Sequence, residues 1–346
     1  MTDLLDLQIK IKHHPFGNIR VKEFEDGSAT NASRFSKTVR FNPGGSPVYV
    51  TSLGNGNVMS IRCSPLKTLQ GHNVFGSNDV IAIASEIICA TLNQLGVSYS
   101  KDQAESWASG DFEIKAIDLT HRFCLPDGLT SFDVCQHLLR TSPVKLLKPQ
   151  WLDQGTGIRL STENSGSTWL LYDKEQELRD KRKNAFSNLK AVVGSDAKVV
   201  WRELQKIAGS TVRAELKLKR DYLNRHGLSK GRVWTAKSAR SLYFSELGGL
   251  PSDVPISLER AFELLKSRSL KFTLLLWSTG SDLRKEFPSS TLRHHRQEIM
   301  RQTGIDIGAD IPTPSTVKLS QIFCRDNVHR LPTVRAFGAA AFLPKG

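Results

Sequence analysis

This sequence of 346 residues lacks several signatures that would assign it to a common class. Its five cysteines are odd in number and form no Cys-x-x-Cys pair, which argues against a disulfide framework and against a zinc finger or ribbon. A phosphate-binding loop of the form GxxxxGKS or GxxxxGKT is missing too, so nothing indicates an ATP-driven motor. A reducing compartment fits this cysteine usage best.

Long apolar runs are also missing. The N-terminal stretch MTDLLDLQIKIKHH has no uninterrupted apolar segment of the kind that forms a signal peptide, and no run approaches the roughly 20 residues that a membrane span needs. We therefore expect a soluble, cytoplasmic protein without a membrane partner.

Positive charge, by contrast, is abundant and unevenly placed. The formal net charge is +14, and residues 179–240 hold 17 Lys and Arg against 5 Asp and Glu. Charge concentrated in this way favours a polyanionic partner, because a general effect on solubility would not be confined to one stretch. We interpret it as a surface that contacts the phosphates of a nucleic acid. The alternatives are an anionic membrane surface and a basic protein that has no polyanionic partner.

The hydrophobic patterns predict an α+β domain. Alternation typical of strands and spacing typical of helices follow one another along the chain. Strands are expected at 5–11, 111–125 and 211–219, hairpins at 47–63 and 155–173, helices at 78–95, 131–140 and 174–190, and a loop or weakly ordered insertion at 25–46. This order indicates an antiparallel sheet with helices packed on one face.

The pattern changes after Gly248-Gly249-Leu250-Pro251. Three helices are expected at 257–269, 271–280 and 289–304, with an extended tail after Leu331. We therefore predict one domain at 1–248 and a small helical, helix-turn-helix-like domain at 249–346.

The helix at 289–304 places Arg293, Gln297 and Arg301 on one broad side, with Arg296 between its two sides. This arrangement is typical of a recognition helix laid against DNA. An ordinary amphipathic helix with a solvated face explains the pattern equally well.

Two acidic residues lie in otherwise apolar strands. Asp118 is flanked by Ile117 and Leu119, and an unpaired acid buried there would cost several kcal/mol. Glu215 shares its strand face with Arg213, so a structural salt bridge is the simpler interpretation. If the two acids lie on neighbouring strands, they form a hard-oxygen site suited to Mg²⁺ or Mn²⁺.

Tyr172 follows three apolar residues, a context more typical of core packing than of catalysis. Lys174 is expected on the same strand face, where it would stabilise a phenolate or contact a phosphate. A tyrosine oxygen beside a divalent ion can attack a phosphodiester and form a covalent intermediate.

A turn rich in basic and amide groups precedes the helix at 78–95. It contains Lys67 and the run LQGHNVFG, in which His72 and Asn73 are candidates to touch phosphate or base. A structured loop that caps the next helix is the alternative. The predicted DNA contacts are Lys67, His72, Asn73, Arg213, Arg293 and Arg296.

The stretch SPLKTLQGHNVFG at 64–76 closely resembles the gene II replication initiators of filamentous bacteriophages. Further segments resemble that family in the same order, over roughly residues 1–310. They are IDLT at 117–120, LYDKEQEL at 171–178, VRAELKLKRDYLNRHGL at 212–228 and TLRHHRQEIMRQTGIDI at 291–307. One departure is Ala116, since the family often has Arg before the IDLT motif.

The resemblance implies a rolling-circle nickase of the host bacterial cytoplasm. Such a protein cuts one strand at the double-stranded phage origin, leaves a 3′-hydroxyl for the host polymerase and helicase to use, and later rejoins the displaced strand. The family tyrosine matches Tyr172, and the acidic positions match Asp118 and Glu215. Many such enzymes hold their metal with a His-hydrophobic-His pair; no His-x-His occurs here, so carboxylates should hold the Mg²⁺ or Mn²⁺.

Two assignments stay open. Glu177 is a rival metal ligand, and Tyr222 is a rival or second nucleophile. A non-catalytic DNA-binding regulator or repressor remains the alternative function, because it needs the basic surface and none of the catalytic residues.

Overall fold

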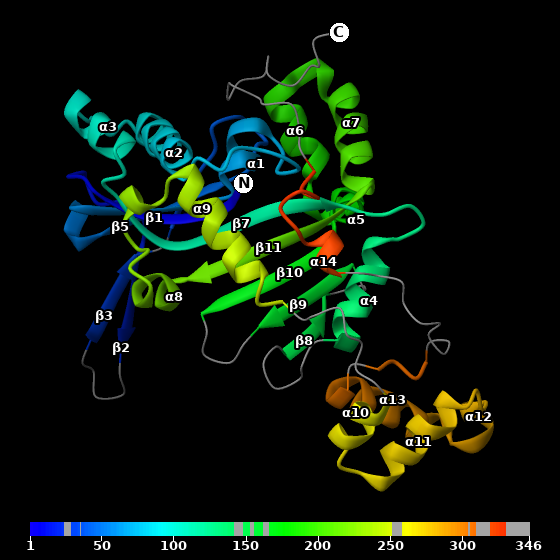
Figure 1. Cartoon of the computed structure of the whole chain (residues 1–346). Coiled ribbons are helices and arrows are strands. Elements are labelled where there is room, and N and C mark those ends of the chain that lie inside the picture. Colours follow the sequence, from blue (N-terminus) through cyan, green and yellow to red (C-terminus); the bar gives the residue numbers. More distant parts are fainter. Residues whose placement is uncertain are drawn as a thin grey trace.

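The computed structural model describes residues 1–23, 29–34, 36–141, 148–152, 156–161, 166–250, 258–303, 305–308 and 319–329. Within this part of the chain the main sheet consists of β1 (Thr2–Lys10), β4 (Lys37–Val39), β5 (Val48–Leu53), β6 (Val58–Cys63), β7 (Glu113–Cys124), β8 (Lys148–Trp151), β9 (Gly157–Ser161), β10 (Ser167–Asp173) and β11 (Thr211–Lys219). These nine strands pair antiparallel in the order β4-β5-β6-β1-β7-β11-β10-β9-β8 (Figure 1). The predicted α+β class with an antiparallel sheet is confirmed.

The centre of the sheet is the pair β7 and β11. All nine residues of β11 have partners in β7, from Thr211 opposite Cys124 to Lys219 opposite Ala116. Because side chains alternate along a strand, β11 has a polar face with Arg213, Glu215 and Lys217 and an apolar face made by the residues between them. The pattern in the sequence therefore separates an apolar core side of the strand from a polar side.

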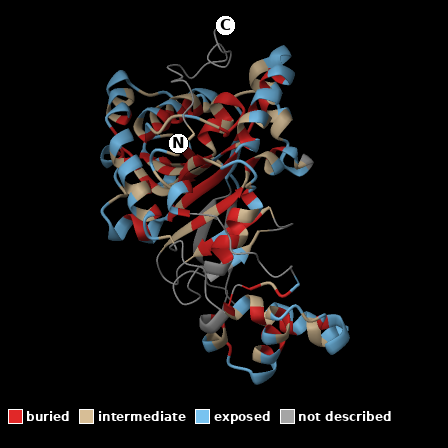
Figure 2. Cartoon of the chain, turned by 45° about the vertical axis from the view of Figure 1, so that its right-hand side comes forward, coloured by how far each residue is buried: buried red, intermediate tan, exposed pale blue. Residues whose placement is uncertain are grey.

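Helices cover the apolar face. They are α2 (Val80–Leu95), α4 (Ser131–Thr141), α9 (Ala236–Leu247) and α14 (Leu319–Ile322), and their buried side chains join those of the strands in one core. Figure 1 shows α9 and α14 in front of β7 and β11, and Figure 2 shows the buried residues gathered in the sheet. The Tyr243 hydroxyl of α9 donates to the Ala214 carbonyl of β11 at 2.9 Å, which fixes the helix to the strand.

Local signals explain several of these elements. Asp79 caps α2 by accepting a hydrogen bond from the Ala82 amide, and Gly96 ends the helix at φ +67°. The predicted hairpins are confirmed as β5–β6 and β9–β10. The turn between β5 and β6 needs Asn55 at φ +52° and Gly56 at φ +85°, conformations that favour Asn and Gly. The first helix of the chain, α1 (Pro65–Gln70), follows β6, and α3 (Lys101–Ala108) and α8 (Arg220–Arg225) follow α2 and β11.

Two predictions of local structure are wrong. The expected loop at 25–46 contains β3 (Ala29–Arg34), which pairs with β2 (Ile19–Glu23), and β4; residues 24–28 and 35 lie outside the described part. Small and polar residues such as ATNASR show no hydrophobic alternation. Strands that form here by pairing with a neighbouring strand therefore cannot be recognised from the hydrophobic pattern. The expected helix at 174–190 is broken after Arg179, and Asn184 takes φ +50° before the next helix.

The helices that replace this single helix form a second core. α5 (Lys174–Arg179), α6 (Ala185–Val193) and α7 (Ala197–Gly209) pack around Leu178, Leu189 and Leu204. Figure 1 shows them at the end of the sheet where β10 ends and β11 begins. The junction of β10 with α5 therefore connects the sheet directly to the second core.

The helices at 258–308 form a third core of their own. They are α10 (Leu258–Leu264), α11 (Arg268–Ser278), α12 (Leu283–Glu286) and α13 (Ser289–Thr303), packed around Leu274 and Ile299. The chain then returns to the sheet, since the Phe323 ring lies 5.2 Å from the Phe123 ring and Val328 pairs with Phe123. The proposed division at residue 248 stays a prediction, and the tail expected after Leu331 lies outside the described residues.

Candidate functional site

Two buried carboxylates meet on the polar face of the central strands. Asp118 of β7 is 5% exposed and Glu215 of β11 is 4% exposed. Lys217 lies directly opposite Asp118 in the strand register. Its ammonium Nζ lies 2.5 Å from Asp118 Oδ2 and 2.6 Å from Glu215 Oε1. One lysine therefore joins both acids, and the sequence analysis had not singled it out.

This carboxylate pair carries more negative charge than one lysine balances. Burial raises the pKa of Asp118, the neighbouring Glu215 raises it further, and Lys217 opposes both, so that the pKa lies at about 7. Burial alone would lower the pKa of Lys217, but the two carboxylates raise it, so Lys217 stays an ammonium. The position between the acids thus favours positive charge.

Tyr172 of β10 lies beside this pair. It is the partner of Arg213 in the pairing of β10 with β11, and its hydroxyl donates to Glu215 Oε2 at 3.1 Å. Burial raises the pKa of Tyr172 well above its usual value, although Arg213 opposes the shift. The side chain is therefore a phenol at neutral pH, with a carboxylate placed to accept its proton.

Lys174 does not lie on the strand face of Tyr172, contrary to the prediction. β10 ends at Asp173, whose side chain accepts a hydrogen bond from the Gln176 amide and so begins α5. Lys174 is the first residue of that helix, fully buried, with Nζ 6.0 Å from the centre of the Tyr172 ring. Burial lowers the pKa of Lys174 to about 8, although the nearby Glu177 opposes the shift. Lys174 is therefore near Tyr172, as predicted, but it approaches the ring from the start of α5 and not from the strand.

Arg213 also lies close to the phenol ring. Its guanidinium carbon lies 5.7 Å from the ring centre, and its Nη2 donates to Asp3 Oδ2 at 2.7 Å. Its Nη1 donates to the Asn73 carbonyl. Asp3 was not predicted to take part; the only signal for it is an acid in the apolar strand β1. A fully buried arginine held on two sides is a rigid support for Tyr172.

His72 and Asn73 are buried, each 3% exposed. The Asn73 amide donates to Asp3 Oδ1 at 2.5 Å, and His72 Nδ1 accepts a hydrogen bond from the Val74 amide at 3.3 Å. Burial lowers the pKa of His72 to about 3, so its ring is neutral. Their contact with DNA stays a prediction, and in this structure they fix the loop that holds Asp3 and Arg213.

The rival residues have other partners. Glu177 accepts a hydrogen bond from Lys174 at 2.6 Å and lies 3.6 Å from Lys67 Nζ. Burial would raise the pKa of Glu177, but these lysines lower it to about 2. Tyr222 belongs to the core of the apolar face, and its hydroxyl donates to Glu246 Oε1 at 2.6 Å. The structure therefore groups Tyr172, and not Tyr222, with Asp118 and Glu215.

The donor set fits a divalent ion. Among the described residues no three His, Cys, Asp or Glu side chains are clustered as a ready-made metal site. Mg²⁺ does not need such a cage, because it keeps several waters and is held by one or two carboxylates together with phosphate oxygens. Asp118 and Glu215 already converge on one cation, the Lys217 ammonium, so their oxygens are placed for that role.

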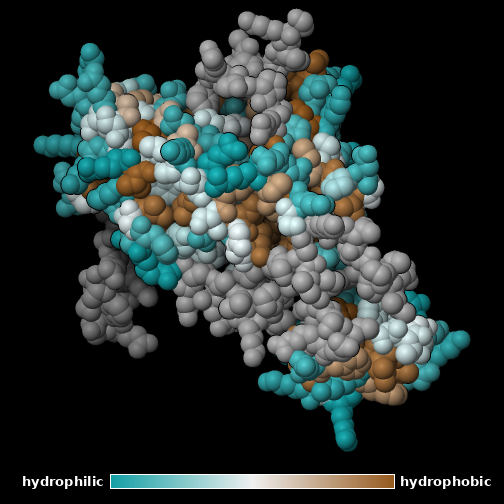
Figure 3. Space-filling model, viewed as in Figure 1, coloured by the Kyte–Doolittle hydropathy of each residue, from teal (hydrophilic) through white to brown (hydrophobic). Residues whose placement is uncertain are grey.

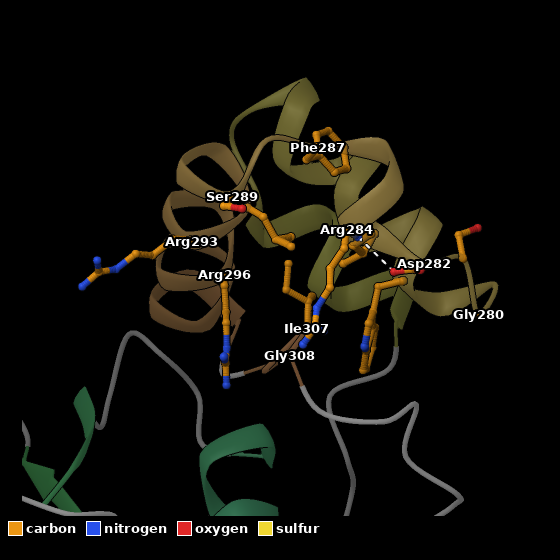
Figure 4. Close-up of a pocket in the computed structure, with 13 residues that line it drawn as sticks. Gly280, Asp282, Arg284, Phe287, Ser289, Arg293, Arg296, Ile307 and Gly308 are labelled. Carbon is orange, nitrogen blue, oxygen red and sulfur yellow. Dashed lines mark hydrogen bonds between the residues drawn. The ribbon is translucent and has the colours of Figure 1, made fainter.

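The predicted DNA contacts of α13 are exposed. Arg293 and Arg296 line a hollow of about 650 Å³ together with Trp277, Arg284 and Phe287 (Figure 4). The Arg296 guanidinium donates to both carboxylate oxygens of Asp306, at 2.6 and 2.7 Å. Arg296 is thereby fixed. In Figure 4 the guanidinium of Arg293 extends outward from the rim of the hollow.

Part of the basic stretch of the sequence lies on the outside of the second core. Figure 3 shows hydrophilic residues along the outer edge of α7. The exposed cations of α5 to α7 and their connections are Arg179, Arg182, Lys183, Lys190, Lys198, Arg202 and Lys206. None of the helices in the described part of the chain is long and apolar enough to cross a membrane.

Comparison with known proteins matches the part of the chain that holds this site. The family model that describes the N-terminal part of the phage replication-associated protein of gene II matches residues 1–237. The replication-associated protein of this type from Enterobacteria phage I2-2 is 22% identical over 262 residues, which are 75% of this chain and 72% of that protein. The corresponding replication-associated protein of Enterobacteria phage M13 is 25% identical over 175 residues, 49% of this chain and 42% of that protein.

Proposed function

Because the chain belongs to the family of phage replication-associated proteins of gene II, we propose that it initiates phage DNA replication by nicking one strand of the double-stranded origin. The same site later rejoins the displaced strand. The observation that supports this proposal is the hydrogen bond from the Tyr172 phenol to Glu215, beside a second buried carboxylate and close to the buried cations Lys174 and Arg213. In the host cytoplasm, the host polymerase would extend the 3′-hydroxyl at the nick, and the host helicase would unwind the duplex.

The proposed reaction is a transesterification. The Tyr172 oxygen forms a bond to the scissile phosphorus, and the bond from phosphorus to the 3′-oxygen breaks. The phenolic proton passes to Glu215, which already accepts it as a hydrogen bond, and the departing 3′-oxygen takes a proton from water. The product is a 5′-phosphotyrosine and a free 3′-hydroxyl. Attack by a 3′-hydroxyl on the phosphotyrosine reverses these steps, so joining needs no ATP.

Two buried cations lie near the Tyr172 ring. Arg213 and Lys174 lie 5.7 and 6.0 Å from the Tyr172 ring centre. Negative charge builds up on the phosphate during the attack, and fixed cations in a site shielded from water offset it effectively. Asp3 and Asn73 act as positioning residues, because they hold the Arg213 guanidinium in place.

We propose that Asp118 and Glu215 hold Mg²⁺ or Mn²⁺. Such an ion, when bound, polarises the scissile phosphate. Carboxylate oxygens are the ligands that both ions prefer.

The partner that fits the outer surface is phage DNA. Among the described side chains, seven exposed cations on and between α5, α6 and α7 match the polyanionic backbone, and Arg293 is an exposed cation of the helices at 258–308. These helices would add recognition of the origin, and the displaced single strand is the second substrate.

Replacing Tyr172 with Phe tests the proposal. The variant removes one oxygen and keeps the ring, so we expect DNA binding to persist while nicking of supercoiled origin DNA and the covalent adduct both disappear. Tyr222→Phe is the matched control and should keep both. Undiminished nicking by the Tyr172 variant would exclude it as nucleophile, and DNA binding without nicking by the native chain would favour a regulator.

A further inference from the structure

The position between Asp118 and Glu215 is filled by a side chain that differs from every other buried cation of the site. Lys217 reaches both acids at 2.5 and 2.6 Å, yet its side chain is 31% exposed. Arg213 is fully buried and is held by Asp3 and by the Asn73 carbonyl. Of these two cations, Lys217 alone can withdraw into solvent without breaking the support of Tyr172.

The two acids, when ionised, favour a cation between them. Both carboxylates are about 95% removed from solvent, and two like charges at such a place cannot stay ionised without a counter-charge. A lysine is a compact point charge on a flexible stem, so it satisfies carboxylates without fixing a planar geometry. The contacts of Lys217 are therefore those of a counter-ion that can be exchanged for another cation.

We infer that the Lys217 ammonium is a displaceable counter-ion, which occupies the place of the divalent ion in the metal-free protein and leaves it when the metal binds. This inference rests on the proposed role of Asp118 and Glu215 as metal ligands. The affinity for the metal is then set by competition with Lys217, and Lys217 balances the charge of the acids when no metal is bound.

When the metal replaces the Lys217 ammonium, the released side chain needs a new position. Lys217 is on the face of β11 that carries Glu215, and its flexible stem leads to the exposed side of the site. Once displaced, its ammonium can turn toward solvent, since the side chain is already 31% exposed.

The inference is tested by measuring how tightly the full chain binds Mn²⁺ in the absence of DNA. Calorimetry and the EPR signal of free Mn²⁺ both measure this binding. We expect Lys217→Ala to bind Mn²⁺ at least about tenfold more tightly than the native chain, because the competing cation is gone; tenfold corresponds to about 1.4 kcal/mol. Lys219→Ala is the matched control, since Lys219 is exposed at the end of the same strand. It should bind as the native chain does. Adding Asp118→Asn to Lys217→Ala should abolish binding.

Thermal melting provides a second readout that a merely structural lysine would not produce. Metal-free Lys217→Ala should melt below the native chain, because two buried acids lose their counter-ion. Mn²⁺ should restore the loss, and NaCl of equal ionic strength should not.

Equal or weaker Mn²⁺ affinity in Lys217→Ala would overturn the inference. If neither protein binds Mn²⁺, the acids are not a metal site and the inference also falls. The proposed nucleophile is tested separately by Tyr172→Phe, so failure of the counter-ion model leaves the nicking assay to decide the function.

Discussion

At the scale of single residues, Lys174 connects the strand that carries the phenol with the helices that carry the basic surface. It is buried against the Tyr172 ring and bound to Glu177, which also approaches Lys67. Its pKa of about 8 lies close enough to neutrality for its charge to depend on pH, because burial disfavours the ammonium. Tyr172 itself does not titrate near neutrality, since its pKa lies well above the usual value.

The pH profile of nicking should report this lysine. Below about pH 8 the ammonium is charged and offsets the charge of the transition state; above it the charge is lost, so the rate should fall as pH rises through about 8. Lys174→Arg keeps its charge at every pH tested and should remove this alkaline fall, because arginine does not deprotonate in proteins. The measurement is the single-turnover nicking rate from about pH 6 to about pH 9.5, a range that spans the pKa of Lys174. The same alkaline midpoint in both proteins would assign the fall to another group.

At the scale of elements, the close contact of β9 with β10 positions Tyr172. Gly157 is the partner of Tyr172 in the pairing of these strands. A Cβ at position 157 would collide with the Leu171 carbonyl oxygen and with Tyr172 Cβ. Only a glycine lets the two strands approach this closely.

Gly157→Ala should therefore push β9 away from β10. We expect a loss of about 1–3 kcal/mol in the free energy of unfolding, as for other overpacked sites, measured by urea denaturation. Nicking should fall as well, because Tyr172 moves relative to Glu215. Gly248→Ala is the control: its φ of −63° suits alanine, and its added Cβ would meet only ordinary contacts. Equal stability of both variants would mean that the strands adjust without cost.

The same elements show how far the sequence alone predicts this site. Alternation located β7 and β11 and placed Asp118 and Glu215 in them, because one face of each strand is apolar. It did not show that Lys217 faces Asp118, because that depends on the pairing of strands about a hundred residues apart. It also placed Lys174 on the strand face of Tyr172, because the hydrogen bond that the Asp173 side chain accepts from the Gln176 amide, which begins α5 and ends β10 at Asp173, leaves no mark in the hydrophobic pattern.

The burial of several polar side chains was also not predictable from the sequence. His72 and Asn73 are polar residues in a turn, which predicts exposure, but their partners Val74 and Asp3 lie inside the protein. Asp3 looked like one more acid near the start of the chain. Polar residues that satisfy one another inside a core have no periodic signature, so only the structure shows them.

At the scale of the whole molecule, the helices at 258–308 have their own core, whereas α14 belongs to the core of the sheet. Replacing residues 251–318 with a flexible linker should therefore leave a stable sheet that still nicks supercoiled DNA. The preference for origin over non-origin plasmids should fall, because Arg293 and its neighbours are gone. Competition between the two plasmids in one nicking reaction measures this preference.

A chain truncated after Leu250 is the matched comparison. It also loses Leu319 and Ile322, which are buried in the core of the sheet. It should melt at a lower temperature than the chain with the linker, because apolar surface that α14 covers becomes exposed. Equal melting temperatures would show that α14 adds nothing to the stability of the sheet, and loss of melting in both would show that the third core supports the first.

Helix α14 also has a consequence for the order of events at the ribosome. Leu319 and Ile322 are synthesised after the whole of residues 258–308, yet they close the core that earlier strands began. Until α14 has been translated, the apolar surface that it covers stays exposed, and exposed apolar surface makes a partly folded chain prone to aggregation. A message cut short before codon 319 would therefore yield a sheet whose core is incomplete, so that the domain that carries Tyr172 matures only after the helices at 258–308 have been made.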